Sequence, residues 1–69
     1  MQEETYYVAE TNSKHKFLCV WNKKKNTYPK IIEDLNGMKM HLGVFVRNTN
    51  YNIRKATIEE INLGLALKI

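Results

Sequence analysis

The feature that most constrains this chain is its small size combined with the lack of any internal cross-link. The chain has 69 residues and a single cysteine, Cys19, so no disulfide can form within it. A domain of this length buries only about 60% of the surface that its unfolded chain exposes, which leaves the folded state marginally stable. We therefore predict one domain over residues 1–69, held by a small hydrophobic core, with residues 1–4 frayed.

The cysteine count also bears on the compartment. Secreted chains this short usually carry several disulfides, so a single cysteine predicts a cytoplasmic protein. No apolar run approaches the roughly 20 residues that a membrane-spanning helix needs. The N-terminus carries Glu3 and Glu4 where a signal peptide would be basic. We expect a soluble protein with no membrane partner.

Two segments near the N-terminus have the residue pattern of strands. Residues 5–9 are rich in strand formers, and residues 15–22 place Phe17, Cys19 and Trp21 on one face and other apolar residues on the opposite face. The short polar residues 11–13 between them predict a turn. We expect an antiparallel hairpin whose second strand lies inside the sheet or is covered by a helix on one side.

Residues 28–37 support two interpretations. In the first, Pro29 opens a short helix over residues 29–36 and Gly37 ends it. In the second, Asn36-Gly37 is a type I′ turn that joins two strands. We favour the helix, because proline cannot donate to a strand ladder and the acidic pair Glu33-Asp34 is poor strand material.

Residues 38–46 have the clearest pattern in the chain. Large apolar residues occur at every second position from Met38 to Val46, which predicts a strand with one apolar face. A cluster of turn-forming residues follows at 47–50. Residues 51–55 fit either a short edge strand or an extended loop.

The C-terminal third begins with a helix signal. Thr57 and Glu60 have the spacing of a capping box, in which each side chain bonds the other residue's amide. We expect Ile58 and Ile61 to face the core and Gly64 to end the helix. Residues 65–69 would then return as a strand, although a continued helix stays open.

These elements together predict an α+β fold. The expected order is β-β-α-β-α-β, in a small antiparallel or mixed sheet with one or two short helices on one face.

Residues suited to catalysis or metal binding are few. His15, His41 and Cys19 are the only histidines and the only thiol, and their spacing matches no common metal site. Cys19 shares its predicted strand face with large aromatic residues, which is typical of a buried cysteine. The three glycines stand singly, so no phosphate-binding loop is present. We predict a protein with no enzymatic activity, no cofactor and no metal.

Positive charge is concentrated in one part of the sequence. The net charge is +4, and residues 14–30 contain six lysines and no acidic residue. Such a segment among strand aromatics suits a polyanion, although a run of three lysines is also typical of a solvated loop. The predicted binding surface consists of Lys16, Lys23, Lys24, Lys25, Tyr28, Lys30 and Tyr6.

Three segments carry a resemblance to a known class of protein. They are Tyr6-Tyr7-Val8, residues 17–21 and residues 56–61, in a chain with high Lys, Asn and Ile usage. In these respects the chain resembles the short accessory proteins of phages and mobile elements of low-GC Gram-positive bacteria. The resemblance implies a small non-enzymatic protein that binds a host or phage component, and it assigns a role to no residue.

Three hypotheses of function follow. The first is a binding module that engages an unidentified protein partner, because tyrosine is enriched at protein interfaces. The alternative is a nucleic-acid-binding protein that uses residues 14–30, whose affinity would fall with salt. The third is a homo-oligomer in which a second subunit covers the apolar residues Leu65, Leu67 and Ile69.

Overall fold

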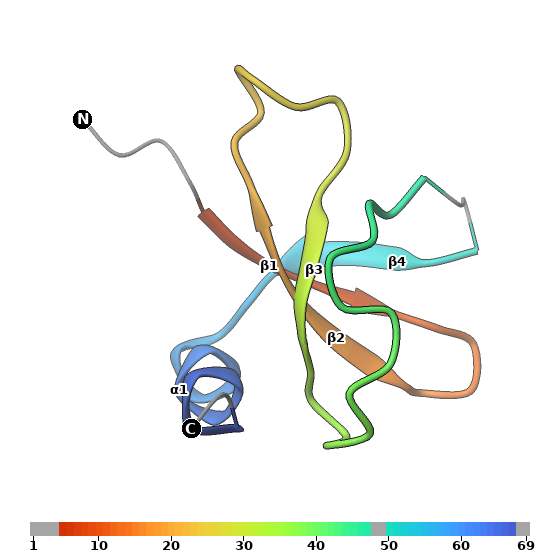
Figure 1. Ribbon diagram of the computed structural model, residues 1–69, viewed down its shortest axis with the longest axis vertical. Helices are drawn as coiled ribbons and strands as arrows, with labels where there is room; N and C mark the ends of the chain where they lie inside the picture. The colour runs from red at the N-terminus through yellow and green to blue at the C-terminus, as the bar shows by residue number, and fades with distance from the viewer. Residues whose placement is uncertain (1–4, 48–49, 68–69) are drawn as a thin grey trace.

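The computed structural model describes residues 5–47 and 50–67, so the predicted fraying of residues 1–4 lies outside the described residues. The elements in chain order are β1 (Thr5–Glu10), β2 (Lys16–Trp21), β3 (Lys30–Asp34), β4 (Asn52–Lys55) and helix α1 (Ile58–Leu67). The strands form one antiparallel sheet in the order β3-β2-β1-β4, with α1 beside it (Figure 1).

The predicted α+β class is confirmed, and the sheet is antiparallel. The predicted order of elements is wrong, because the described residues follow the order β-β-β-β-α with a single helix.

The N-terminal hairpin agrees with the prediction. β1 and β2 pair from Thr5 opposite Trp21 to Glu10 opposite Lys16. In the turn, the carbonyl of Thr11 accepts a hydrogen bond of 3.0 Å from the amide of Lys14. β2 lies between β1 and β3, which confirms that the second strand is an inner one.

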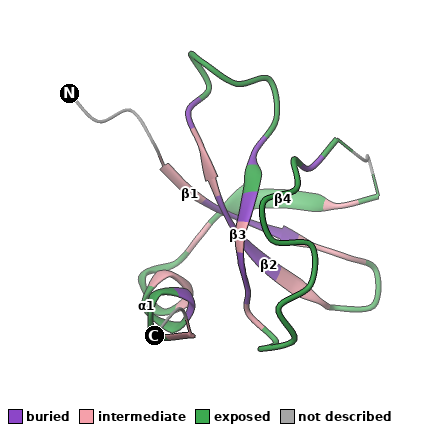
Figure 2. Ribbon diagram, viewed as in Figure 1, coloured by how far each residue is buried: buried purple, intermediate pink, exposed green. Residues whose placement is uncertain are grey.

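The two faces of the sheet are covered differently. On the first, which we call the loop-covered face, residues of β1, β2 and β3 pack with Val46 from the segment that follows β3. On the other, the helix-covered face, Leu18 packs against Gly64 of α1. Figure 2 shows the buried residues concentrated where the strands cross at the centre of the molecule. The core of the loop-covered face consists of Tyr7, Ala9, Phe17, Cys19, Ile31 and Val46.

The favoured helix over residues 29–36 is wrong. These residues form β3, which pairs with β2 through Ile31 opposite Cys19 and Glu33 opposite Leu18. Pro29 stands just before the first residue of the strand, where no amide is needed. The other interpretation is correct in that residues 30–34 form a strand, because pairing with β2 and partners for both carboxylates outweigh the weak strand preference of Glu33-Asp34. Its type I′ turn at Asn36-Gly37 is wrong, because the turn bond runs from the amide of Gly37 to the carbonyl of Asp34 and the φ angle of Asn36 is not positive.

The strand predicted over residues 38–46 is also wrong. Lys39, His41 and Gly43 have φ angles of 58°, 60° and 83°, which interrupt an extended chain. Within the described part of this segment, strand pairing is limited to an isolated bridge between Phe45 and Lys30. Residues 52–55 do form an edge strand, β4, as one of the two interpretations predicted.

Helix α1 begins as predicted and ends later. The amide of Thr57 donates to Oε1 of Glu60 over 2.9 Å, and the amide of Glu60 donates to Oγ1 of Thr57 over 3.2 Å, which completes the capping box. Gly64 does not end the helix, so the strand predicted over 65–69 is wrong for 65–67, while 68–69 lie outside the described residues. Ile58 is 74% exposed and does not face the core.

Candidate protein-interaction surface

The segment between β3 and β4 exposes an unusual number of large apolar side chains. Five of them in residues 38–45 are 37–61% exposed. We call residues 38–45 the apolar segment. Figure 2 shows this segment as a continuous exposed stretch beside β3. Contiguous exposed apolar side chains of this kind mark interaction sites more often than scattered single ones do. The five side chains are Met38, Met40, Leu42, Val44 and Phe45.

Asp34 fixes the start of the apolar segment. Its side chain is fully buried, and its oxygens accept hydrogen bonds from the amide of Asn36 over 2.9 Å and the amide of Met40 over 3.2 Å. Nε2 of His15 lies 2.8 Å from the same carboxylate. Burial raises the pKa of Asp34, but the hydrogen bonds from Asn36, His15 and Met40 outweigh it, so the pKa lies below its usual value. Asp34 therefore stays ionised and holds the backbone of the segment.

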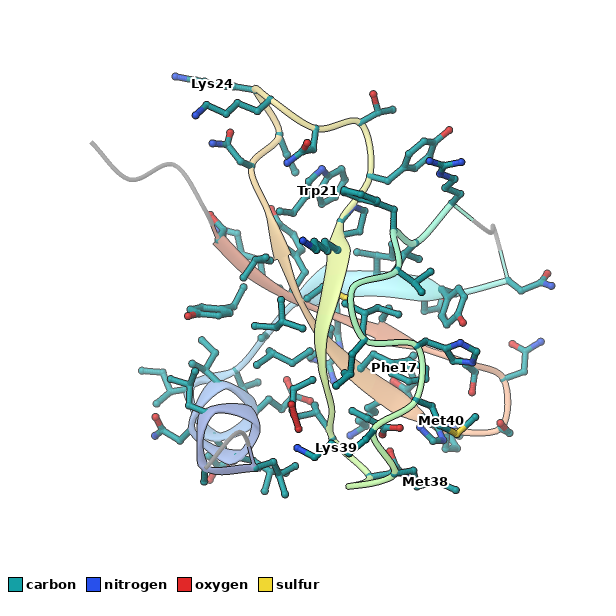
Figure 3. The ribbon with its side chains drawn as sticks, in the orientation of Figure 1. Phe17, Trp21, Lys24, Met38, Lys39 and Met40 are labelled. Carbon is teal, nitrogen blue, oxygen red and sulfur yellow. The ribbon has the colours of Figure 1, made fainter. Side chains whose placement is uncertain are left out.

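Lys39 anchors the segment on the other face of the sheet. Its Nζ donates to the buried carboxylate of Glu33 and, over 2.6 Å, to the carbonyl oxygen of Leu67 in the last turn of α1. One side chain of the segment thus contacts both β3 and α1 (Figure 3). This arrangement directs the Lys39 side chain toward Glu33 and α1, and the neighbouring Met38 and Met40 are exposed.

Backbone hydrogen bonds fix the end of the segment along the outer edge of β3. The amide of Gly43 donates to the carbonyl of Ile31 over 2.7 Å, and the amide of Val46 donates to the carbonyl of Pro29 over 2.7 Å. Val46 itself is buried in the core. The backbone is therefore held at both ends, so a partner that contacts these side chains would order little additional chain on binding.

A shallow basic hollow adjoins the far end of the segment. It has a volume of about 310 Å³ and is lined by residues of the β2–β3 loop and by residues 45 and 47. The guanidinium carbon of Arg47 lies 5.8 Å from the centre of the Tyr28 ring. We call this site the basic hollow. Its lining residues are Lys25, Asn26, Thr27, Tyr28, Phe45 and Arg47.

The structure brings together some of the predicted site residues and separates others. Lys23, Lys24, Lys25 and Tyr28 all lie on the loop between β2 and β3. Lys23 is turned toward the sheet, with its Nζ 5.3 Å from the centre of the Tyr7 ring and 4.9 Å from that of Trp21.

The remaining three predicted residues do not lie on the β2–β3 loop. Tyr6 and Lys30 are both register partners of Val20, which places them on the helix-covered face. Nζ of Lys16 lies 3.8 Å from the carboxylate of Glu60 in α1. Residues 14–30 therefore do not form one continuous basic surface.

Sequence reasoning missed the apolar segment and Arg47 as candidate binding residues. The period-two pattern at 38–46 predicts a strand with one apolar face, and these apolar residues are not part of the predicted binding surface. The sequence signal against a straight strand was the presence of Gly37 and Gly43. Glycine readily adopts positive φ angles, and both residues have them in the structure.

The groups most suited to chemistry either lie in the core or pack against Phe17. Cys19 is buried, as predicted, and burial raises the pKa of its thiol to about 12. The ring of His15 stacks on Phe17 with 4.5 Å between ring centres, and the ring of His41 meets Phe17 edge-on. Among the described residues, no group of three or more His, Cys, Asp or Glu side chains is placed to hold a metal ion.

Comparison with known proteins gives no further guide to function. No family model matches the chain, and searches of curated proteins and of solved structures find no match. Over the residues that the structure describes, there is no helix of the length and apolar character needed to cross a membrane.

Proposed function

We propose that this chain is a small non-enzymatic binding protein that engages a protein partner through its apolar segment. The observation that carries the proposal is the set of five large apolar side chains that stand exposed on a backbone anchored by Asp34, Lys39 and β3. Complete burial of a fully exposed side chain of this size is worth about 1.5–3 kcal/mol, and these side chains are 37–61% exposed, so each can contribute roughly half of that. A partner that covers even part of this segment would gain a substantial binding free energy.

The chemistry of the segment favours a protein surface as the ligand. Methionine is flexible and polarisable, and it is common at surfaces that bind protein segments of varied shape. The segment contributes Met38 and Met40 together with Leu42, Val44 and Phe45. The resemblance to accessory proteins of phages and mobile elements agrees with this proposal and makes a bacterial host protein the natural class of partner.

The test is a comparison of surface variants in partner capture. The native chain, a Met40→Glu/Leu42→Glu variant and an Ile58→Glu/Leu63→Glu variant are immobilised and exposed to lysate of a low-GC Gram-positive bacterium. Ile58 and Leu63 are exposed apolar residues of α1, so the second variant is a control with the same charge change. We expect a protein that the native chain and the α1 variant retain and that the segment variant loses.

Equal retention by all three chains would contradict the proposal. Urea unfolding of each variant establishes first that the folds are equally stable, so that loss of a partner cannot be assigned to unfolding.

A second candidate function is nucleic-acid binding by the β2–β3 loop. The observation in its favour is the group of cations at one end of the molecule, Lys23, Lys24, Lys25 and Arg47, beside the exposed ring of Tyr28. Against it, two of the strand aromatics that could stack on bases are buried, with Phe17 2% and Tyr7 8% exposed, and Tyr6 lies on the helix-covered face.

Mobility-shift titrations with single- and double-stranded DNA and RNA test this candidate. If the loop binds nucleic acid, affinity falls steeply between low and moderate salt as counterions are released. Trp21 follows the same titration by fluorescence, because its Nε1 donates to the carbonyl of Asn26 in the loop over 3.1 Å. No shift at low salt would remove the candidate.

A further inference from the structure

The apolar segment and the basic hollow are parts of one surface. Phe45 is the last exposed apolar residue of the segment, and it also lines the hollow together with Lys25 and Arg47. Figure 3 shows Met38 and Met40 at one end of the molecule and Lys24, on the loop that borders the hollow, at the opposite end. The surface therefore runs from an apolar end to a cationic end.

The hollow has the chemistry of a carboxylate site. No acidic residue is among the described residues that line it. Three acidic side chains outside the lining are bound elsewhere, Asp34 to His15, Glu33 to Lys39 and Glu60 to Arg54. An approaching anion would meet Lys25 and Arg47 with no nearby carboxylate from the lining to compete.

Arg47 is partly oriented before anything binds. Its guanidinium group lies over the ring of Tyr28, which is itself 41% exposed. A guanidinium can present two N–H donors at once to a planar carboxylate. The hollow thus offers the guanidinium of Arg47 and the ammonium of Lys25 among its lining residues.

We propose that the protein partner docks an acidic-apolar segment, with apolar side chains along residues 38–45 and an Asp or Glu carboxylate in the basic hollow. This inference rests on the proposed function and deepens it, because it specifies the partner's chemistry. The order is fixed by the surface: apolar residues meet the Met38 end, and the acid meets the Phe45 end.

A nucleic acid fits this surface less well than a protein segment does. A polynucleotide carries a phosphate at every nucleotide and needs cations along its whole path. Within residues 38–44 the exposed side chains are mostly apolar, and the one lysine among them, Lys39, is bound to Glu33 and to the carbonyl of Leu67. A single carboxylate next to apolar side chains matches the one cationic site next to the apolar segment.

The test uses a random library of 16-residue peptides displayed on phage and selected on the native chain. We expect enriched peptides to combine apolar residues with Asp or Glu at one end. The best peptide is then synthesised with a fluorophore, and its affinity is measured by anisotropy at two salt concentrations. A Lys25→Glu/Arg47→Glu variant should bind it at least about tenfold more weakly, as expected for lost charge complementarity.

A matched control separates the hollow from net charge. Lys14→Glu/Lys55→Glu makes the same change in net charge at exposed lysines outside the hollow lining, and it should change affinity by less than about twofold at the higher salt. Lys25→Gln/Arg47→Gln serves as a milder second variant, should charge reversal disturb the fold.

The possible results distinguish the inference from the proposed function. The selected peptides could lose binding to the Met40→Glu/Leu42→Glu variant, contain no enriched acid, and bind the hollow variants as tightly as they bind the native chain. That result would overturn the inference alone. A selection without any segment-dependent peptide would overturn both. An oligonucleotide that binds through the hollow and is not displaced by the peptide would also overturn the inference, in favour of nucleic acid.

Discussion

Glu33 and Asp34 are adjacent carboxylates at the end of β3, and both are buried. Their side chains point to opposite faces of the sheet, as successive strand residues do. Glu33 contacts Lys39, and Asp34 accepts hydrogen bonds from backbone amides beyond β3. A buried charge is tolerated only when it is paired and hydrogen-bonded. At the scale of single residues, these two acids weaken the strand propensity of β3, but their contacts fix the backbone of the apolar segment.

Replacement of Asp34 by asparagine should destabilise the protein in a pH-dependent way. At pH 7 we expect Asp34→Asn to lower the free energy of unfolding by about 2 kcal/mol, because hydrogen bonds to a buried charge are lost. The pKa of Asp34 is lowered in the folded state. Its stabilisation is therefore complete above about pH 4, the pKa region of an unfolded Asp, and is lost as pH falls through the lower folded pKa.

Urea unfolding of both proteins between pH 7 and pH 2.5 measures this effect. We expect the difference in stability between native and Asp34→Asn protein to shrink at the acidic end. A difference that stays constant over the whole range would contradict the role of the ionised carboxylate.

Cys19 should react only after the protein unfolds. Its thiol is buried and has a pKa of about 12, whereas an unperturbed thiol has a pKa of about 8.5. At pH 8 the native protein should react with Ellman's reagent at least about a thousandfold more slowly than the chain in concentrated urea, because the thiolate is the reactive form. Similar rates in both conditions would mean that the loop-covered face opens readily.

At the scale of elements, the position of α1 depends on one glycine. A Cβ atom on Gly64 would lie 2.4 Å from Cδ2 of Leu18 and 3.3 Å from Cδ2 of Leu35. The helix can therefore approach the sheet closely only because this residue lacks a side chain. Gly64 thus has a packing role in the middle of the helix, which outweighs its usual effect as a helix end.

Gly64→Ala should destabilise the protein although alanine is the better helix former. The gain in helix propensity is about 1 kcal/mol, but Leu18 is fully buried and has little room to move. We expect a net loss of about 1–2 kcal/mol in thermal or urea unfolding. Asn62→Ala, at an exposed position of the same helix, should be neutral or stabilising. A stabilised Gly64→Ala variant would show that the helix can shift away from the sheet.

Glu60 should link the N-terminus of α1 to β4. Hydrogen bonds from Arg54 lower the pKa of Glu60 to about 2, and bonds from Thr57 add to this against the opposing effect of burial. Since Arg54 is partly exposed, we expect Glu60→Gln to cost only about 1 kcal/mol at pH 7. This stabilisation is present above the unfolded pKa of 4.5 and is lost as pH falls toward 2.

Unfolding at low and high salt checks the assignment to Glu60. Salt should reduce the effect of Glu60→Gln, and Glu59→Gln, at the exposed neighbouring position, should have little effect. Equal effects of the two substitutions would assign the stabilisation to helix-dipole charge in general.

At the scale of the whole molecule, the two edges of the sheet differ in how far the rest of the chain covers them. Hydrogen bonds from residues 43–46 cover part of the outer edge of β3, whereas all four residues of β4 at the other edge are exposed. The chain uses its longest irregular segment to cover one edge and one face, so Val46 is buried while its apolar neighbours are left in solvent. The segment between β3 and β4 therefore contributes one apolar residue to the core and leaves the others on the surface.

The apolar segment should be dispensable for stability. Met40→Ser/Leu42→Ser removes two exposed apolar side chains and should change the free energy of unfolding by less than about 0.5 kcal/mol. Ile31→Ala, at a position only 1% exposed, should cost about 3 kcal/mol. A large loss for the segment variant would place these side chains in the core of the protein in solution and would remove the proposed interaction surface.

Sequence alone determined the elements whose signals lie close together in the chain. The hairpin of β1 and β2 follows from two alternating segments joined by a short polar turn, and the start of α1 follows from the reciprocal bonds of Thr57 and Glu60. The start of the β2–β3 loop, with Lys23, Lys24 and Lys25, was predictable from the sequence because a run of three lysines is typical of a solvated loop. These features need no knowledge of distant contacts.

Only the tertiary structure decided the middle of the chain and the end of the helix. Residues 30–34 form a strand because the free edge of β2 pairs with them. Gly64 lies inside the helix, where its missing side chain lets α1 pack against Leu18. The period-two pattern at 38–46 indicated which side chains are apolar but not whether anything covers them. Cover depends on contacts between residues far apart in sequence. Here Asp34 and Lys39 direct the backbone so that four of those side chains remain exposed and only Val46 is buried.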